Sequence, residues 1–174
     1  MESFTLLPQL PGSAFGDGSH PTTRLCARAV DFLCRQRPFP SVLDVGTGTG
    51  ILARTARKNG ASFIVGTDID SVALESARAN AALDLSPVEI LVSAAPPDHW
   101  GPRFDLVVSN ILENVLVDLA PLISRALAPR GQLLLSGFTR LQVPRLQLAY
   151  DNQGLSRVSC SYLDDWALLH FLKE

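Results

Sequence analysis

Apolar residues along the chain fall into short blocks that alternate between strand and helix periodicity. Compact apolar runs bounded by turn residues predict strands at 41–45, 62–67, 88–92, 104–109 and 132–136. Apolar residues at helical spacing predict helices over 21–36, 51–58, 72–83, 113–127 and 139–152. The segment 94–103 is too rich in proline for a helix. Because strands and helices alternate, we expect an α/β fold with a doubly wound, mostly parallel sheet.

The two ends of the chain complete this outline. Two further strands are expected at 155–162 and 166–172, joined by a short acidic turn as an antiparallel hairpin, so the sheet has seven strands. At the other end, prolines and glycines predict an irregular leader over 1–19. Pro121 and Pro144 lie inside their expected helices, where a proline removes a backbone hydrogen bond. We interpret 1–174 as a single domain.

Composition narrows the class of protein. Apolar residues make up 47% and charged residues 18% of the 174 residues, as in a soluble α/β protein, and the net charge of −2 argues against a nucleic acid as the direct substrate. No apolar run approaches the roughly 20 residues of a membrane helix, and no signal peptide is expected. Cys26, Cys34 and Cys160 form no CxxC pair, which indicates reduced thiols and a cytoplasmic location.

Three glycines mark the strongest candidate for a ligand site. Gly46, Gly48 and Gly50 stand at alternate positions between the strand at 41–45 and the helix at 51–58. Glycine permits a tight turn and lets a ligand approach the backbone closely. The spacing differs from the G-x-G-x-x-G of dinucleotide sites and lacks the Lys-Ser/Thr of a P-loop. It favours a nucleoside without a pyrophosphate, such as S-adenosyl-L-methionine, over an ordinary strand-to-helix turn.

An acidic residue and an amide follow the next strands. Asp68 lies 22 residues after Gly46, where a carboxylate accepts hydrogen bonds from both ribose hydroxyls. The alternative is that Asp68 caps the following helix, a role open to Asp70. No acidic residue follows the strand at 88–92 before Asp98, so adenine recognition is expected to use backbone groups. Asn110 directly follows the strand at 104–109, either beside a reacting methyl group or as a helix cap.

The leader carries its own candidates. Phe15 and His20 stand among small residues directly before a helix, so the leader is expected to fold over the cofactor as a lid, with Thr23 offering a hydroxyl. The alternatives are a flexible leader and a His20 with a structural role. The three histidines, His20, His99 and His170, are too scattered for a zinc site or a catalytic triad, and no metal is expected.

Four motifs together resemble a known family, the bacterial methyltransferases that modify large-subunit ribosomal protein number eleven. The motifs are Ala14-Phe15-Gly16-x-Gly18-x-His20-Pro21-Thr22-Thr23, Leu43-Asp44-Val45-Gly46-x-Gly48-x-Gly50-Ile51-Leu52-Ala53, Gly66-x-Asp68-Ile69-Asp70 and Val107-Val108-x-Asn110-Ile111-Leu112. The resemblance runs from about Pro11 to the C-terminus. It implies a class I S-adenosylmethionine-dependent methyltransferase, with Thr23, Gly46, Asp68 and Asn110 as cofactor contacts and Ile69 beside them.

The chain departs from that family in two respects. Asp17 stands where the family usually has threonine. The family also has a separate N-terminal domain that positions the ribosomal substrate, whereas only about ten residues precede the first motif here. The chain is therefore expected to be either an excised catalytic domain or a relative with another substrate.

The resulting hypothesis is methyl transfer from S-adenosyl-L-methionine to an amine of a protein, with a ribosomal protein as the candidate substrate. Displacement is in line, so the protein mainly orients the reactants, and Asn110 would accept a hydrogen bond from the amine. Glu113, Asp17 and His20 are the candidate bases. Alternatives are methylation of a small molecule or nucleic acid, a cofactor-binding module without chemistry, and a dehydrogenase. The Asn110 segment lacks the prolines and aromatic residue typical of enzymes that methylate bases.

Overall fold

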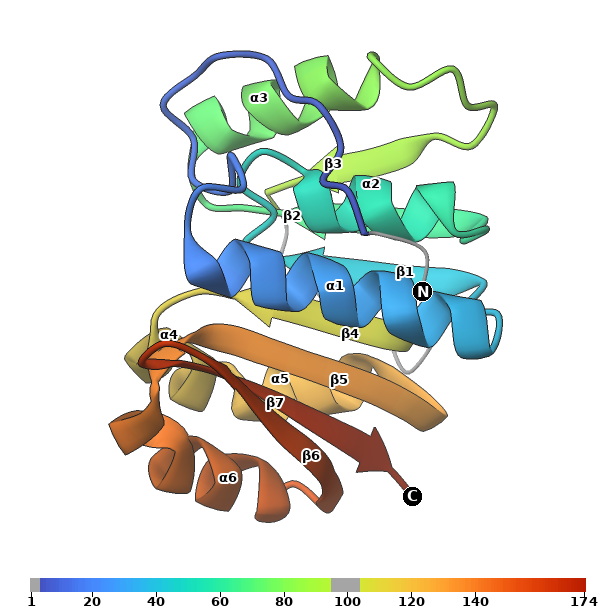
Figure 1. The fold of residues 1–174 in the computed structure, drawn as a ribbon. Helices are drawn as coiled ribbons and strands as arrows, with labels where there is room; N and C mark the ends of the chain where they lie inside the picture. The colour runs from blue at the N-terminus through green and yellow to red at the C-terminus, as the bar shows by residue number, and fades with distance from the viewer. Residues whose placement is uncertain (1–3, 95–103) are drawn as a thin grey trace.

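The computed structural model describes residues 4–94 and 104–174, which form a seven-stranded sheet between two layers of helices (Figure 1). The first half of the chain contains α1 (Pro21–Gln36), β1 (Ser41–Val45), α2 (Ile51–Lys58), β2 (Phe63–Thr67), α3 (Ser71–Ala81) and β3 (Ile90–Ser93). The second half contains β4 (Phe104–Asn110), α4 (Glu113–Asp118), α5 (Ala120–Ala126), β5 (Leu127–Thr139), the 3-10 helix η2 (Arg140–Gln142), α6 (Val143–Asp151), β6 (Leu155–Leu163) and β7 (Trp166–Lys173). The expected α/β class and the seven strands are confirmed.

The strand order places a crevice in the middle of the sheet. The order is β3-β2-β1-β4-β5-β7-β6, with β1 to β5 parallel and β7 antiparallel to both β5 and β6. The chain winds outward from β1 to β3, and then returns to β4 on the other side of β1. Ligands of open α/β sheets bind beyond the carboxyl ends of the strands at such a reversal. The ends of β1 and β4 carry the glycine turn and Asn110.

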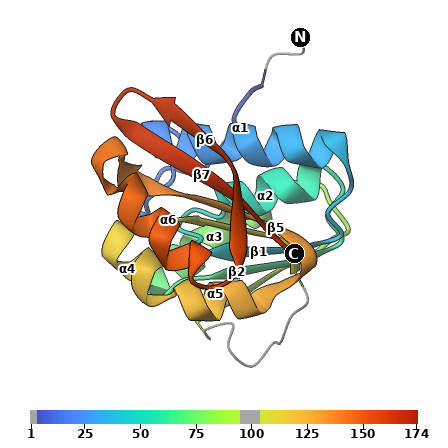
Figure 2. The same ribbon diagram turned by 90° about the horizontal axis from the view of Figure 1, so that it is seen from below.

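Two apolar cores hold the layers together. One core joins α1 and α2 to one face of the sheet, and the other joins α4, α5 and α6 to the opposite face, as Figure 2 shows. In the first core Cys26, Ala27 and Val30 of α1 are fully buried, which confirms the helical spacing that the sequence shows. The three cysteines are free thiols, and two of them are buried in this core. The parallel strands are apolar on both sides because helices cover both faces.

Proline accounts for one difference from the expected elements. The helix expected over 113–127 is divided into α4 and α5, which meet at Leu119. Pro121 lies in the first turn of α5, where its missing N–H is not needed. Pro144 likewise lies in the first turn of α6, after η2 has replaced the start of the helix expected over 139–152. Both prolines therefore set a helix start.

The strand β5 is longer than expected. Its expected span was 132–136, with a turn before it, but β5 already begins at Leu127. Its pairing with β4 shifts between Phe104 and Leu106, and Arg130 adopts a positive φ of 61°. The expected turn is thus an irregularity within the strand. The proline-rich segment expected to be non-helical, with Asp98, lies outside the described residues apart from Ala94.

The leader is irregular but anchored. Residues 4–20, the part of it that is described, contain no helix or strand. Arg54 of α2 is fully buried and donates from Nη1 to the Pro8 carbonyl oxygen at 2.9 Å. The same guanidinium donates from Nε and Nη2 to the Asp84 carboxylate at 2.9 and 2.6 Å. One arginine therefore connects the leader, α2 and the segment after α3.

Within 4–94 and 104–174, the structure has no helix that is both long and apolar enough to cross a membrane.

We expect Arg54→Met to lower the free energy of unfolding by about 1–3 kcal/mol, because it removes the hydrogen bonds of a buried guanidinium to the partly exposed Asp84, which keeps its ion pair with Arg57, and leaves the Pro8 carbonyl oxygen without its donor. Urea denaturation followed by circular dichroism measures the change. Arg24→Met, on the exposed face of α1, is the control and should change the free energy by less than about 0.5 kcal/mol. Equal effects of the two substitutions would contradict the anchoring role.

Candidate active site

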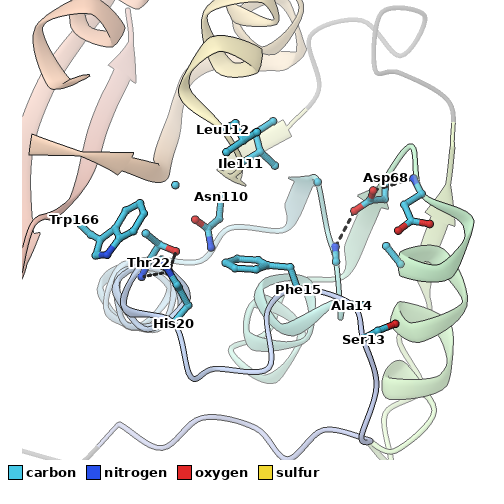
Figure 3. A pocket seen from close by; sticks show the side chains of 15 residues that line it. Ser13, Ala14, Phe15, His20, Thr22, Asp68, Asn110, Ile111, Leu112 and Trp166 are labelled. Carbon is cyan, nitrogen blue, oxygen red and sulfur yellow. Dashed lines mark hydrogen bonds between the residues drawn. The ribbon is translucent and has the colours of Figure 1, made fainter. Parts of the chain in front are cut away.

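A cavity of about 510 Å³ lies at the carboxyl edge of the sheet, beside the ends of β1 and β4. It is lined by residues from the leader, α1, the ends of β1, β2 and β4, and the starts of α3 and β7: Ser13, Ala14, Phe15, His20, Thr22, Gly46, Gly48, Asp68, Asp70, Ala73, Asn110, Ile111, Leu112, Gly137 (in β5) and Trp166. Figure 3 shows Trp166, His20 and Asn110 toward one end and Asp68 toward the other. Its volume suits a small-molecule ligand.

The glycine turn forms one wall of this cavity. The backbone N–H groups of Gly46 and Thr47 both donate to the Thr67 carbonyl oxygen at 2.8 Å, which fixes the turn against the end of β2. Gly46 and Gly48 have φ values of 74° and 54°. A Cβ on Gly46 would overlap the Ile111 side chain, and one on Gly48 would overlap the Phe15 carbonyl oxygen. Both positions therefore require glycine for conformation and for space.

The third glycine has a different place. Gly50 is the N-cap of α2, and a Cβ added there would lie 3.3 Å from Ala77 of α3. Gly50 is not among the described residues that line the cavity. It allows α2 and α3 to approach each other behind the turn. The sequence pattern alone did not distinguish this packing position from the two that face the cavity.

Asp68 lies where the sequence analysis expects it, at the end of β2. Its Oδ2 accepts from Gly48 N at 3.0 Å, and its Oδ1 accepts from Asp70 N at 3.1 Å. Asp70, not Asp68, caps α3 by accepting from Val72 N at 2.9 Å. An ionised carboxylate has about four acceptor positions, so roughly two remain for a ligand. Ile69 beside it is 99% exposed and does not line the cavity in the described chain.

Asn110, the last residue of β4, lines the cavity and carries a buried side-chain oxygen. Its Nδ2 donates to Thr23 Oγ1 at 3.5 Å, while its Oδ1 is buried and finds no hydrogen-bond partner among the described residues. The N-cap of α4 is Leu112, so Asn110 does not serve as the helix cap that the sequence left open. Thr23 is fully buried and does not line the described cavity wall, whereas its neighbour Thr22 does. The Thr23 hydroxyl therefore lies behind Asn110.

Three rings surround the end of the cavity beside Asn110. The His20 ring lies edge-on to Trp166, with centroids 4.5 Å apart, and 5.4 Å from the Phe15 ring. His20 also caps α1, because its Nδ1 accepts from Thr22 N at 3.3 Å and lies 2.7 Å from Thr22 Oγ1. These contacts favour the tautomer with the proton on Nε2. His20 thus has the structural role that the sequence left open and also lines the cavity.

The other candidate bases lie elsewhere. Glu113 accepts from Arg145 Nη1 at 3.0 and 3.1 Å, and Asp17 accepts from Ser19 at 2.6 and 2.9 Å, which lowers the pKa of the Asp17 carboxyl. Neither residue is among those described as lining the cavity. The described residues also contain no group of three or more His, Cys, Asp or Glu side chains placed to hold a metal ion.

Trp166, Thr22 and Gly137 are cavity residues that the sequence analysis missed. Trp166 pairs with Thr139 at the end of β5. Because β7 runs antiparallel to β5, the start of β7 reaches the same edge as the ends of the parallel strands. The hairpin expected at the C-terminus could therefore have predicted that Trp166 lies at this edge of the sheet. Gly137 has a φ of 97°, and a Cβ there would overlap the backbone of Ile111.

A second carboxylate lies directly under the turn. Asp44 of β1 is fully buried, and its Oδ2 accepts from Thr47 Oγ1 at 2.7 Å and from Ala53 N at 3.2 Å. Its Oδ1 has no partner within the described part of the chain. The pKa of Asp44 is raised to about 7: burial is the main cause, the nearby Asp68 charge adds to it, and the two hydrogen bonds oppose it.

The fold and this cavity define a class of protein. The magnesium protoporphyrin IX methyltransferase from Synechocystis PCC 6803, solved with bound SAM, superposes with a TM-score of 0.66 at 17% identity, over 96% of this chain and 88% of that chain. The N-methyltransferase NodS from Bradyrhizobium japonicum WM9 gives a TM-score of 0.70 at 14% identity, over 90% and 89%. The chain thus has the Rossmann-like fold of S-adenosylmethionine-dependent methyltransferases.

Closer matches identify the family. The family model of ribosomal protein L11 methyltransferase (PrmA) matches residues 6–174. The ribosomal protein L11 methyltransferase of Myxococcus xanthus (strain DK1622) is 42% identical over 156 residues, covering 90% of this chain and 53% of the relative. The solved L11 methylase of Lactobacillus delbrueckii subsp. bulgaricus has a TM-score of 0.84 at 33% identity, over 95% of this chain and 84% of that one. The chain belongs to the ribosomal protein L11 methyltransferase family.

The chain spans about half the length of the curated relatives it matches. It covers 53% of the Myxococcus xanthus protein and 54% of the 41% identical relative from Syntrophotalea carbinolica (strain DSM 2380 / NBRC 103641 / GraBd1).

We expect Asp44→Asn to change how stability depends on pH. The pKa of Asp44 is about 7 in the folded chain against 3.8 for an ordinary aspartate, so between these values the folded state binds the extra proton. This group's contribution to the free energy of unfolding therefore falls as the pH rises from about 4 to about 7, by up to about 4 kcal/mol. Asparagine does not titrate, so the variant loses that slope.

Urea denaturation of both proteins at pH 4, 5, 6, 7 and 8 measures this effect. The unfolding free energy of Asp44→Asn minus that of the unaltered chain should rise from pH 4 to about pH 7 and stay constant above pH 7. A difference that is constant across the whole range would show that the pKa of Asp44 is not raised.

Proposed function

We propose that this chain is the catalytic unit of an S-adenosyl-L-methionine-dependent protein methyltransferase that methylates an amine of a ribosomal protein. The observation that carries the proposal is the position of Asn110, which lines the same cavity as the glycine turn and Asp68 and whose buried Oδ1 has no hydrogen-bond partner within the described chain. A buried acceptor without a partner costs about 1–3 kcal/mol, and a ligand that donates a hydrogen bond there removes that cost.

The residues of the cavity fit the cofactor. Asp68 has acceptor positions left after its two backbone hydrogen bonds, which suits the two ribose hydroxyls. Gly46 and Gly48 present backbone without side chains on the adjoining wall. When bound, S-adenosyl-L-methionine supplies a methyl group on a positively charged sulfur. The family membership and the solved neighbours with bound SAM support this cofactor.

Asn110 and the three rings suit the orientation of an amine. A free lysine amine has a pKa of about 10.4 and must lose a proton before it attacks a methyl group. The apolar surroundings of Phe15 and Trp166 disfavour the charged form and lower the pKa of an amine placed there. Asn110 Oδ1 can then accept one N–H of the neutral amine and direct its lone pair.

Ribosomal protein L11 is the substrate that we propose for this site. The support is the name shared by the relatives at about 40% identity over most of the chain. Because the chain spans about half of those relatives, both the activity and the substrate require a direct test. The cytoplasmic location, the single-domain organisation and the assignments of Thr23, Gly50 and Ile69 to the cofactor stay predictions.

We expect Asp68→Ala to weaken the binding of S-adenosylhomocysteine by about 1–3 kcal/mol, or about 5- to 150-fold in Kd, because the ribose hydroxyls lose a charged acceptor. Isothermal titration calorimetry measures the affinity. Asp105→Ala is a matched control: Asp105 at the start of β4 accepts from the Ser41 N–H at 3.1 Å, far from the cavity at the other end of β1. Unchanged affinity in Asp68→Ala would remove this residue from the site.

The activity itself is tested by incubating the chain with ribosomal protein L11 and S-adenosyl-L-methionine, followed by mass spectrometry. We expect added mass in steps of one methyl group. Asn110→Ala should lower kcat about 100-fold through misplacement of the amine, with the cofactor affinity changed much less. Asn152→Ala, an exposed residue after α6, is the control.

Other outcomes of this experiment decide between the alternatives. Methylation of ribosomal RNA or of a small amine, but not of the protein, would reassign the substrate. Tight binding of S-adenosylhomocysteine without methylation of any acceptor would favour a binding module. Binding of NADH in preference to S-adenosylhomocysteine would favour a dehydrogenase.

A further inference from the structure

A polar side chain on the buried face of α3 connects the leader to the glycine turn. Asn80 is fully buried, although asparagine is a poor residue for a helix interior. Its position continues the buried face formed by Ala73 and Ala77, where the helical spacing calls for an apolar residue. Burying an asparagine at such a position costs folding free energy unless its amide forms hydrogen bonds.

The Asn80 amide has partners on two segments that are distant in sequence. Its Oδ1 accepts from Leu10 N at 2.8 Å, and its Nδ2 donates to the Thr49 carbonyl oxygen at 3.1 Å. The two backbone partners fix the orientation of the amide, because the first is a donor and the second an acceptor. Figure 1 shows the leader, in dark blue, passing beside α3.

Thr49 extends this connection to the part of the leader that lines the cavity. Thr49 N donates to the Phe15 carbonyl oxygen at 3.0 Å, and Thr49 Oγ1 donates to the Gly16 carbonyl oxygen at 2.9 Å. Asn80 therefore holds the leader at Leu10, and Thr49 holds it at Phe15 and Gly16. Asn80 also holds Thr49 itself, through the Thr49 carbonyl oxygen. The residues between these attachments include Ser13 and Ala14, which line the cavity.

We propose that Asn80 is a positioning residue for cofactor binding: it keeps the leader closed against the glycine turn and so maintains one wall of the cofactor cavity. Asn80 is absent from the described cavity lining and acts through Leu10 and Thr49. This inference rests on the proposed function for its cofactor, but the closure of the leader is independent of it.

The experiment compares Asn80→Leu, which keeps an apolar core volume, and Asn80→Asp with the unaltered chain. Asn80→Leu removes the hydrogen bonds to Leu10 and Thr49, together with the longer one from Nδ2 to Ser76 Oγ at 3.4 Å. We therefore expect the Kd for S-adenosylhomocysteine to rise about 10-fold by calorimetry, and the KM for S-adenosyl-L-methionine to rise more than kcat falls. In hydrogen exchange without ligand, the amides of Leu10 and Thr49, which are the N–H donors of these attachments, should exchange at least about 10-fold faster.

Asn80→Asp separates the two attachments. It keeps the acceptor for Leu10 N but places an oxygen against the Thr49 carbonyl oxygen. The Leu10 amide should therefore stay protected from exchange, while the Thr49 amide, which donates to the Phe15 carbonyl oxygen, should exchange faster. Asn59→Ala is the matched control, because Asn59 Nδ2 donates to Asp31 and Thr55 at the end of α2, outside the described cavity wall. It should lower the melting temperature without changing the Kd.

The outcomes are distinguishable from those of the proposed function. If the unaltered chain binds no S-adenosylhomocysteine, the proposed function fails, and the role of Asn80 in cofactor binding fails with it. If the unaltered chain binds and Asn80→Leu binds equally tightly, or its leader stays as protected as in the unaltered chain, this inference alone is overturned.

Discussion

The hydrogen bond from Gly48 N to the Asp68 carboxylate is the constraint on which the site depends. It ties the turn after β1 to the end of β2, at 3.0 Å, while the Thr67 carbonyl oxygen accepts from the two preceding N–H groups of the same turn. A carboxylate held by backbone donors keeps a defined orientation, because rotation would forfeit charge-assisted hydrogen bonds. The cavity wall and the acceptor that faces it are therefore fixed relative to each other by a contact between neighbouring parallel strands, not by side chains from a mobile loop.

Topology then brings the remaining parts to the same edge. The reversal of winding between β1 and β4 places Asn110 next to the glycine turn, and the antiparallel β7 carries Trp166 back to that edge. The leader forms a wall of the cavity without belonging to a strand or helix. Its hydrogen bonds come from Arg54 of α2, Asn80 of α3 and Thr49 of the glycine turn. This division explains why an irregular segment, which cannot hold its own shape, lines a defined cavity.

The elements of the fold were predictable from sequence because their periodicity is local, whereas long-range contacts were not. Asp68 was placed correctly at the end of β2, and the structure assigns the helix cap to Asp70, a choice that residue types alone left open. The expected helix over 113–127 was wrong because Pro121 starts a second helix instead of being tolerated within one. The sequence analysis assigned no role to Arg54 or Asn80, since nothing local to a sequence indicates a partner 46 or 70 residues away.

The buried Asn110 Oδ1, which has no partner among the described residues, bears on which methyl-accepting group suits this site. The Asn110 Nδ2 lies 3.5 Å from Thr23 Oγ1, while the Oδ1 is buried and has no partner among the described residues. An amide oxygen at this position is complementary to a nucleophile that carries a hydrogen, and a neutral amine has an N–H to donate while its lone pair attacks. A carboxylate nucleophile has no such hydrogen and would set two oxygens against each other in a buried place. Under the proposed function, this buried amide oxygen suits transfer to nitrogen better than the formation of a methyl ester.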